Sequence, residues 1–338
     1  MDSDRKFSIE DFDYYVPKDL IAQEPIQPRD KARLMILQGF SIQHKIFSDI
    51  PNYVGEGDVL VINNTRVIPA RFFGRKESGG RVEALLVRKR SDGSWEALVS
   101  GKNIKPGSKL LFDDFSAEIL SKEGNKFILS FSSDAEDILP KGEVPLPHYI
   151  KKRIENPEDY QTVYSKRAGA IASPTAGLHF TPQLMKNIED KGARFVEITL
   201  HVSLGTFQPV HDISSHKMDP EYYEVSHEAA EIINSAFRSG RRIFAVGTTV
   251  LKTLETVSRL GVVYPGSGES SLFIKPGYRF ESPVSALITN FHTPRSTLIM
   301  LLAAFSGYDE VMNAYRVAVS ERYRFFSFGD AMLAYKKG

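Results

Sequence analysis

Cysteine is absent from the 338 residues of this chain. Its absence excludes disulfide bonds, thiolate nucleophiles, cysteine-ligated zinc and iron–sulfur clusters held by the protein. Long apolar runs are lacking as well, since the longest, at residues 298–305, is far shorter than the ~20 residues that span a bilayer. The first six residues carry no apolar core of the kind found in signal peptides. We therefore expect a soluble, cytoplasmic protein with no membrane partner.

A net excess of either charge is also lacking, because 43 Lys and Arg residues are balanced by 42 Asp and Glu residues. Bulk charge therefore gives no indication of nucleic-acid binding, and any such surface must be a local patch. One candidate patch lies at residues 66–90, where eight residues are basic and two are acidic. Basic strands of this kind can follow a phosphate backbone, but edge strands protected by charge explain the pattern equally well.

The chain is longer than one hydrophobic core usually organises, and its pattern of apolar residues changes along its length. Short apolar segments recur at roughly ten-residue intervals over residues 58–131, separated by Gly-Gly, Asp-Gly, Pro-Gly and Gly-Asn pairs. Such spacing is typical of a small β-barrel or sandwich. Beyond residue 147 helical and strand patterns alternate, which indicates an α/β domain. We predict a larger mixed α/β domain, residues 1–62 and 148–338, interrupted by a small antiparallel β-barrel domain, residues 63–147.

One loop of the α/β part combines turn formers, hydroxyls and a histidine: Ala-Ser-Pro-Thr-Ala-Gly-Leu-His-Phe-Thr, residues 172–181. Pro174 fixes φ and Gly177 allows a positive φ, so we expect a shaped backbone. Thr181 and the proline after it are typical of a helix start, and a helix N-terminus favours an anionic ligand. His179 precedes that start and could act as an acid, a base or a hydrogen-bond donor. A purely structural turn explains the loop equally well.

Other strand ends of the α/β part carry similar residues. His201 lies near the end of a strand expected at residues 194–203, before a Gly-Thr-Phe-Gln-Pro loop at residues 205–209, and His292 follows a strand at residues 285–289. At residues 247–249, Gly-Thr-Thr joins a strand to a helix and could receive a carboxylate or phosphate. Because ligands of open α/β sheets bind outside the carboxyl ends of strands, we expect these loops and their histidines to converge.

Three histidines also suit zinc or iron, which would make the chain a metal-dependent hydrolase. Their separations of 22 and 91 residues match no compact metal motif, so we expect no bound metal. A non-catalytic RNA-binding protein is the other alternative. Polar loops rich in His, Thr and Asn argue against it, because binding alone does not need them.

Ordered motifs extend over nearly the whole chain. They include Asn-Asn-Thr-Arg-Val-Ile-Pro-Ala-Arg (63–71), Ser-Pro-Thr-Ala-Gly-Leu-His-Phe (173–180), Leu-His-Val-Ser-Leu-Gly-Thr-Phe (200–207), Thr-Asn-Phe-His (289–292) and Phe-Gly-Asp-Ala-Met (328–332). In this order they resemble the motifs of the S-adenosylmethionine:tRNA ribosyltransferase-isomerases of queuosine biosynthesis. The resemblance implies a β-barrel domain beside a larger α/β domain, as the residue patterns predict independently.

The resemblance also implies an activity. S-adenosylmethionine would serve as a ribosyl donor, and the acceptor would be 7-aminomethyl-7-deazaguanine at the wobble position of a tRNA. Adenine and methionine leave, and the ribosyl unit rearranges to an epoxycyclopentanediol, which gives epoxyqueuosine. The expected partners are this tRNA and S-adenosylmethionine, which is consumed as a co-substrate. We expect no other cofactor, no metal and a monomeric chain.

Candidate roles follow from fitting residues to that reaction. The candidate acids and bases are His179, His201 and His292, with Asp330 as a partner of the amine or a reader of a base edge. The candidates for holding S-adenosylmethionine are Thr175, Gly177, Gly247, Thr248, Thr289 and Asn290. The candidates for phosphate contact with tRNA are Arg66, Arg71, Arg75 and Lys76.

Four positions depart from the usual family pattern. Ser173, His148, Lys252 and Phe328 stand where alanine, proline, arginine and tyrosine are common. If the family's arginine holds a carboxylate by two hydrogen bonds, Lys252 would do so less specifically. None of the four changes removes a proposed acid or base.

Overall fold

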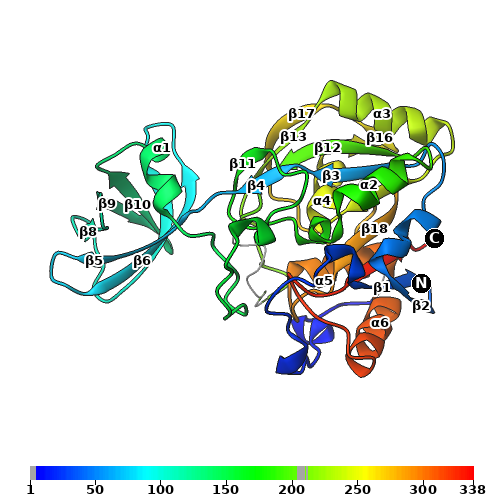
Figure 1. Ribbon diagram of the computed structural model, residues 1–338, viewed down its shortest axis with the longest axis horizontal. Coiled ribbons are helices and arrows are strands. Elements are labelled where there is room, and N and C mark those ends of the chain that lie inside the picture. The colour runs from blue at the N-terminus through cyan, green and yellow to red at the C-terminus, as the bar shows by residue number, and fades with distance from the viewer. Residues whose placement is uncertain (1–4, 204–209, 211) are drawn as a thin grey trace. The chain divides into compact units, whose positions relative to one another are not determined.

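The computed structural model describes residues 5–203, 210 and 212–338 and divides into two compact units (Figure 1). Unit 1 comprises Met1–Arg66, Pro147–Ala168 and Ser173–Gly338, and unit 2 comprises Val67–Leu146 and Gly169–Ala172. Unit 1 is a mixed α/β structure and unit 2 contains a closed antiparallel β-barrel, so the predicted fold class is confirmed. The loop expected at residues 205–209 lies outside the described residues.

The described part of unit 1 is organised by a nine-stranded mixed sheet in the order β17-β13-β12-β3-β14-β18-β19-β1-β2. Neighbours β12 and β3, β3 and β14, β14 and β18, and β19 and β1 are parallel, and the other neighbours are antiparallel. The strands are β1 (Arg33–Gln38), β2 (Ser41–Ile46), β3 (Val59–Asn63), β12 (Arg194–Leu200), β13 (Glu221–Val225), β14 (Ile243–Val246), β17 (Gly266–Ser270), β18 (Val284–Asn290) and β19 (Ala331–Tyr335).

The central strands are apolar because both of their faces are covered. Every residue of β3 and of β14 is buried. Successive side chains of a strand point to opposite faces, and so Val61 belongs to one core cluster while Leu60 and Ile62 belong to the other. Buried parallel strands therefore read as continuous hydrophobic runs, which is the pattern at residues 59–62.

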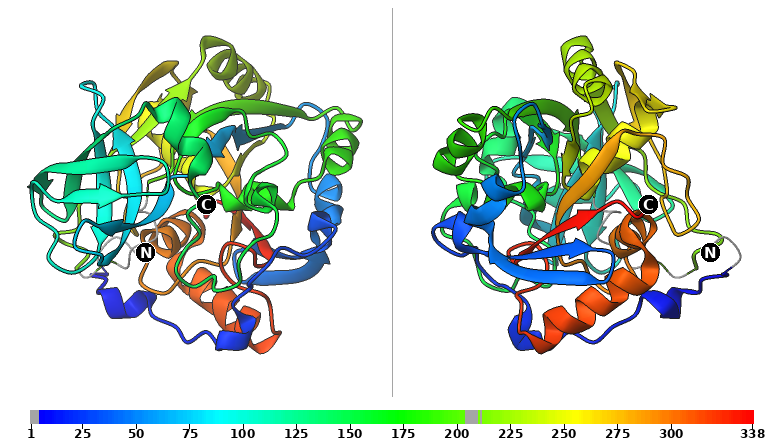
Figure 2. Two further views of the ribbon diagram at one scale, coloured as in Figure 1. Left: turned by 60° about the vertical axis from the view of Figure 1, so that its left-hand side comes forward. Right: turned by 90° about the vertical axis from the view of Figure 1, so that its right-hand side faces the viewer.

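Helices cover the two faces of this sheet unequally. The first core cluster contains the buried residues of α3 (His227–Arg238), α4 (Thr248–Val257), α5 (Thr297–Ser306) and α6 (Tyr308–Ser320), and α6 lies along β1 (Figure 2). The second contains those of α2 (Pro182–Glu189) and of the short helix η4 (Phe47–Asn52). No helix of the described residues is long and apolar enough to cross a membrane.

The helix start predicted at Thr181 is confirmed by its cap. The side-chain oxygen of Thr181 accepts a hydrogen bond from the backbone N–H of Leu184 at 3.1 Å, and Ser226 and Ser296 begin α3 and α5 in the same way. Each cap satisfies a backbone donor that the first helical turn leaves free.

Several further elements of the described chain are short, and η5 among them belongs to unit 2. They are η1 (Ile9–Phe12), η2 (Lys18–Leu20), η3 (Arg29–Lys31), β4 (Thr65–Val67), η5 (Leu139–Lys141), η6 (Pro157–Tyr160), β11 (Arg167–Ala170), η7 (Thr175–His179), β15 (Ser258–Arg259) and β16 (Val262–Val263).

Unit 2 has its own core inside the barrel, whose strand order is β10-β7-β6-β5-β8-β9. Short strands are present at the roughly ten-residue intervals that the sequence predicts. The barrel strands are β5 (Arg71–Lys76), β6 (Arg81–Lys89), β7 (Trp95–Ser100), β8 (Lys109–Leu111), β9 (Ser116–Glu123) and β10 (Lys126–Phe131), followed by the single-turn helix α1 (Ala135–Ile138). Strand β5 was not predicted from the sequence, because it is rich in basic residues and only Phe72 is buried, so it lacks the apolar pattern of the other strands.

Candidate active site

A pocket of unit 1, the main pocket, lies where the parallel strands β14 and β18 end at the same edge of the sheet. After β14, Gly247 adopts a φ of 100° and turns the chain into α4, which begins at Thr248. About 530 Å³ of space lies outside the protein atoms here, part of it open to solvent. The main pocket is lined by Tyr149, Ser173, Pro174, Thr175, Ala176, Val202, Gly247, Thr248, Thr249, Thr289, Asn290, Phe291, His292, Thr293, Leu298, Phe326 and Ser327.

His292 lines the main pocket and is held from several sides. Its Nε2 lies 2.8 Å from Thr289 Oγ1, and its backbone N–H donates to the Tyr315 hydroxyl at 2.9 Å. The Tyr14 hydroxyl donates to its backbone carbonyl. Burial lowers the pKa of His292 to about 3, so the imidazole is neutral at physiological pH.

His179 lies behind the pocket wall. Its Nε2 is 3.3 Å from Nδ2 of Asn290, which does line the main pocket, and its ring packs against Phe47 with 5.0 Å between centroids. Burial, together with the positive charges of Arg324 and Arg29, lowers the pKa of His179 to about 3. His179 is therefore a neutral side chain that contacts the main pocket through Asn290.

His201 is held elsewhere in unit 1. Its Nδ1 lies 2.8 Å from Thr65 Oγ1, and its ring stacks on Tyr222. Burial and the nearby Arg167 lower its pKa. It is absent from the lining of the main pocket, so the structure brings His292 and, through Asn290, His179 to this pocket and places His201 outside its lining.

Asp330 also lies outside that lining. Its carboxylate accepts hydrogen bonds from the backbone N–H groups of Arg33 at 2.9 Å and of Arg324 at 2.8 Å. Burial raises the pKa of Asp330. These contacts tie Asp330, which directly precedes β19, to the start of β1 and to Arg324.

Five of the six residues predicted to hold S-adenosylmethionine line the main pocket: Thr175, Gly247, Thr248, Thr289 and Asn290. Gly177 does not. The expectation of a positive φ at Gly177 was wrong, and glycine is needed there for a different reason. A Cβ at this position would overlap the hydroxyl of Tyr164.

Two buried polar atoms near the main pocket lack a hydrogen-bond partner among the residues that the structure describes, Ser173 Oγ and Asn290 Oδ1. Buried polar atoms are normally paired, so such atoms in a pocket wall are available to hydrogen-bond with water or with polar groups of a ligand. Sequence reasoning noted Ser173 only as a departure and missed Tyr149, whose hydroxyl lies 2.8 Å from Ser327 Oγ. The signal for Tyr149 was its place in the motif Pro-Leu-Pro-His-Tyr-Ile, residues 145–150.

The predicted tRNA-contacting residues fall in both units. Arg66, in unit 1, is bound by Ser165 and Glu158. In unit 2, Nε of Arg71 donates to Glu83 at 2.7 Å, Lys76 donates to a backbone carbonyl, and Arg75 is exposed. The four residues therefore do not form one patch within either unit.

Strand β5 presents an unpredicted aromatic residue beside these cations. Phe73 is 54% exposed and alternates with Arg71 and Arg75 along the strand, so that the three side chains share the outer face. We call them the β5 face. The guanidinium of Arg71 lies 5.1 Å from the centre of the Phe73 ring.

Residues 5–203, 210 and 212–338 contain no group of three or more His, Asp or Glu side chains that could hold a metal ion. In the two histidines nearest the main pocket, Nε2 already faces Thr289 or Asn290.

Comparisons with known proteins agree over nearly the full length of the chain. A family model described as "Queuosine biosynthesis protein" matches residues 9–334. The S-adenosylmethionine:tRNA ribosyltransferase-isomerase of Carboxydothermus hydrogenoformans is 50% identical over 335 residues, covering 96% of this chain and 99% of the relative. The protein of the same name from Thermosipho melanesiensis is 49% identical over 335 residues, with 97% and 99% covered.

A solved structure also matches. The crystal structure of S-adenosylmethionine tRNA ribosyltransferase from Thermotoga maritima is 42% identical, covers 96% of this chain and 99% of its own, and has a TM-score of 0.57. The predicted resemblance is confirmed. The chain belongs to the family of queuosine biosynthesis proteins that comprises the S-adenosylmethionine:tRNA ribosyltransferase-isomerases.

Proposed function

We propose that this enzyme transfers the ribosyl unit of S-adenosylmethionine to 7-aminomethyl-7-deazaguanine at the wobble position of tRNA. The products are epoxyqueuosine in the tRNA, adenine and methionine. The observation that carries the proposal is the meeting of Thr248, Asn290 and His292 in one pocket of a chain that belongs to this family. The main pocket is the site that we assign to S-adenosylmethionine.

Several residues in the wall of the main pocket carry polar groups. Hydroxyls of Thr248 and Thr175 and the amide of Asn290 line it, and the N-terminal end of α4 begins at the same place. Ribose hydroxyls and the edge of adenine need such donors and acceptors. Ser173 Oγ and Asn290 Oδ1 are the two atoms that a bound ligand would satisfy.

We assign proton transfer to His292, because it is the member of the predicted histidine set that lines the main pocket. Its imidazole is neutral at pH 7 and can accept a proton without first losing one. In S-adenosylmethionine the sulfonium stabilises negative charge on the neighbouring C5′ atom, which makes the C5′ proton the one to be abstracted. The imidazolium that forms is a stronger acid than that of an ordinary histidine, because burial lowers its pKa, and it can protonate the departing adenine.

We assign His179 a positioning role. It touches Asn290 and not the pocket itself, so its effect on substrate passes through the orientation of that amide. A neutral Nε2 that accepts the hydrogen bond from Asn290 Nδ2 leaves Asn290 Oδ1 as an acceptor for the substrate.

The β5 face of unit 2 is the surface that we propose for tRNA. Exposed Arg75 supplies charge for a phosphate, and the exposed ring of Phe73 supplies a surface on which a base can stack. The charge of Arg71 is partly balanced by Glu83, so we expect it to contribute less than Arg75.

Three further proposals complete this function. The reaction needs no metal ion or added cofactor, because Nε2 of His292 and Nε2 of His179 already lie within hydrogen-bonding distance of Thr289 and Asn290. The chain acts as a monomer, which light scattering on the purified protein tests. It acts in the cytoplasm, where its tRNA substrate is found.

The deciding experiment incubates the protein with S-adenosylmethionine and a tRNA that bears 7-aminomethyl-7-deazaguanine. We expect adenine and methionine to appear in equal amounts, and only in the presence of that tRNA. The matched control is the same tRNA with unmodified guanine at the wobble position, which should release neither product. Transfer of a methyl group, or no adenine release, would contradict the proposal.

A further inference from the structure

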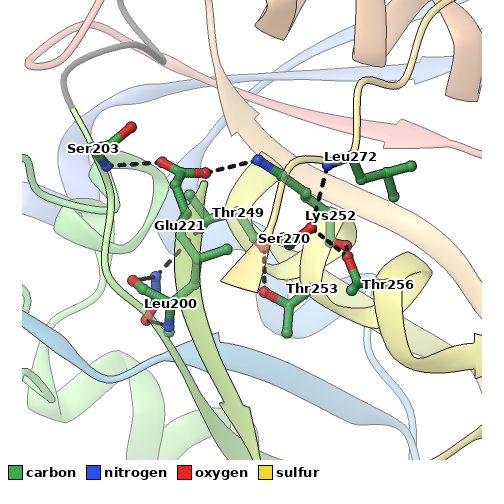
Figure 3. A network of polar contacts seen from close by, with 10 residues as sticks. Leu200, Ser203, Glu221, Thr249, Lys252, Thr253, Thr256, Ser270 and Leu272 are labelled. Carbon is green, nitrogen blue, oxygen red and sulfur yellow. Dashed lines mark hydrogen bonds and ion pairs between the residues drawn. The ribbon is translucent and has the colours of Figure 1, made fainter. Parts of the chain in front are cut away.

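A second pocket of unit 1, the side pocket, adjoins the main pocket and shares Thr248, Thr249 and Leu298 with its lining. Most of its other walls are apolar and include Leu272, Phe273, Ile274 and Leu301. Two charged residues also line it, Glu221 from β13 and Lys252 from α4, and their side chains point toward each other (Figure 3). The side pocket is therefore an apolar chamber with one cation and one anion in its wall.

The two charges form a buried ion pair. Nζ of Lys252 donates to Oε2 of Glu221 at 2.9 Å, and the side chains are 7% and 1% exposed. Oε1 of Glu221 accepts a hydrogen bond from the backbone N–H of Ser203 at 2.8 Å, which fixes the carboxylate (Figure 3). Apolar residues in place of a buried ion pair often leave a fold equally or more stable, so stability alone does not explain the pair.

A further polar atom points to a ligand. Thr297 lines the side pocket, and its Oγ1 is buried without a hydrogen-bond partner in the part of the chain that the structure describes. Such an atom costs free energy unless something pairs with it. An ion pair and an unsatisfied hydroxyl in an apolar chamber together favour a ligand that is apolar along its length and charged at its end.

We infer that the side pocket receives the methionyl part of S-adenosylmethionine and that the ammonium of Lys252 binds its α-carboxylate. This inference rests on the proposed function of the main pocket. Glu221 is the positioning residue: it holds Lys252 in place through their ion pair and presents negative charge to the α-ammonium group of the substrate. The apolar walls contact the two methylene groups between the sulfonium and the charged end.

Binding of the methionyl part in the side pocket also determines where the reacting atoms of S-adenosylmethionine lie. Thr248 and Thr249 line both pockets, so the sulfonium lies at their junction when the methionyl end is in the side pocket. The adenosyl part then lies in the main pocket, where His292 lines the wall. Lys252 therefore determines which donors bind, and it takes no part in proton transfer.

The test compares two donors in each variant: S-adenosylmethionine and its decarboxylated analogue, which lacks only the α-carboxylate. Adenine release with acceptor tRNA gives kcat/KM for each donor. For the wild type we expect a preference of about 10- to 100-fold for S-adenosylmethionine, the range for a hydrogen bond to a charged group. In Lys252→Met the preference should fall close to one, mainly through KM, while Lys252→Arg should retain it.

Because the preference is a ratio measured within one variant, a reduced folded fraction cancels from it. Lys252→Met leaves Glu221 buried without its cation and could fail to fold. The double variant Glu221→Gln with Lys252→Met removes both charges and should fold, again with no preference. Equal losses for both donors in these variants, with the preference intact, would overturn the inference.

Failure of the inference can be told apart from failure of the proposed function. If the wild type releases no adenine from S-adenosylmethionine and acceptor tRNA, the proposed function is contradicted. Equilibrium dialysis with both donors then still tests Lys252. If the wild type is active but shows no donor preference, only the inference fails.

Discussion

Nδ2 of Asn290 lies 3.3 Å from Nε2 of His179, so the amide at the wall of the main pocket is held by a histidine that does not itself reach the pocket. His292, two residues further along the chain from Asn290, does reach it. The two histidines share a lowered pKa and near-complete burial, but they differ in what they touch. Substitutions should therefore separate their roles.

Replacing His292 by Gln should lower kcat by about 10²-fold or more, because proton transfer by a positioned side chain contributes at least that much. Replacing His179 by Gln should act mainly on KM for S-adenosylmethionine, by about 10-fold, the effect of one weakened hydrogen bond through Asn290. Steady-state adenine release measures both. An unchanged kcat in His292→Gln would remove that residue from proton transfer.

The neutral state of these histidines predicts how stability depends on pH. The folded-state pKa values are about 3, against 6.5 for an ordinary histidine. Between these values the unfolded chain binds more protons, so the free energy of unfolding falls as pH decreases below 6.5, and the loss is complete near pH 3. Between these pKa values each histidine changes the free energy of unfolding by about 1.4 kcal/mol per pH unit. Above pH 7 both histidines are neutral in the folded and the unfolded chain, so neither makes stability depend on pH.

Urea unfolding at pH 5, 6 and 7 measures this slope. The free energy of unfolding of His292→Gln should depend less steeply on pH than that of the wild type, by about one proton, since glutamine does not titrate. An identical slope in the two proteins would mean that His292 is not buried in its neutral form.

Close packing at Gly177 predicts a stability defect. Gly177→Ala should destabilise the fold by about 1–3 kcal/mol, the cost of an added methyl in a filled site. The added Cβ meets the Tyr164 hydroxyl first and then the Tyr164 ring and Thr162. Tyr164→Phe removes only the hydroxyl, which has no partner among the described residues, so the double variant should recover part of the loss. Strict additivity of the two changes in a thermal unfolding cycle would contradict the clash.

The β5 face predicts two different effects on tRNA binding. Arg75→Glu should weaken binding and reduce the slope of log affinity against log salt by about one or more, because it removes a phosphate contact. Phe73→Ala should weaken binding by about 1–3 kcal/mol without changing that slope, because stacking does not release counterions.

The matched control for Phe73 is Leu120→Ala on β9, since Leu120 is 49% exposed on the same barrel. Filter binding at several salt concentrations measures all three variants. If the control weakens binding as much as Phe73→Ala does, the effect is not specific to the β5 face.

The proposed absence of a metal predicts that elemental analysis of the active protein finds well under one zinc or iron per chain. Dialysis against a chelator that is then removed should leave turnover unchanged. Stoichiometric metal that is lost together with activity would favour a histidine-bound metal centre instead.

Local sequence patterns predicted much of the secondary structure. The cap at Thr181 follows from a side-chain oxygen that satisfies a free backbone donor, and it lies where the sequence predicts a helix start. Evenly spaced short strands between turn pairs predicted the barrel. Strand β5 was missed because a strand that exposes Arg71, Phe73 and Arg75 has no apolar run.

The structure brings predicted site residues together where loops follow neighbouring parallel strands. Gly247, Thr248, Thr289 and Asn290 follow β14 or end β18, and the carboxyl ends of parallel neighbours must meet. His201 failed this test although its strand, β12, also runs parallel to β3. Its side chain binds Thr65 and stacks on Tyr222, which are contacts that no local pattern specifies.

The amino-acid sequence by itself determined the fold class, many of the helix and strand positions and the family, because these depend on local periodicity, caps, turns and ordered motifs. Tertiary structure alone decided the environment of each side chain. Burial among residues distant in sequence makes His179 and His292 neutral, the approach of Tyr164 requires glycine at position 177, and the meeting of β13 with α4 pairs Glu221 with Lys252. These properties depend on desolvation and on contacts between distant segments, which a sequence pattern does not record.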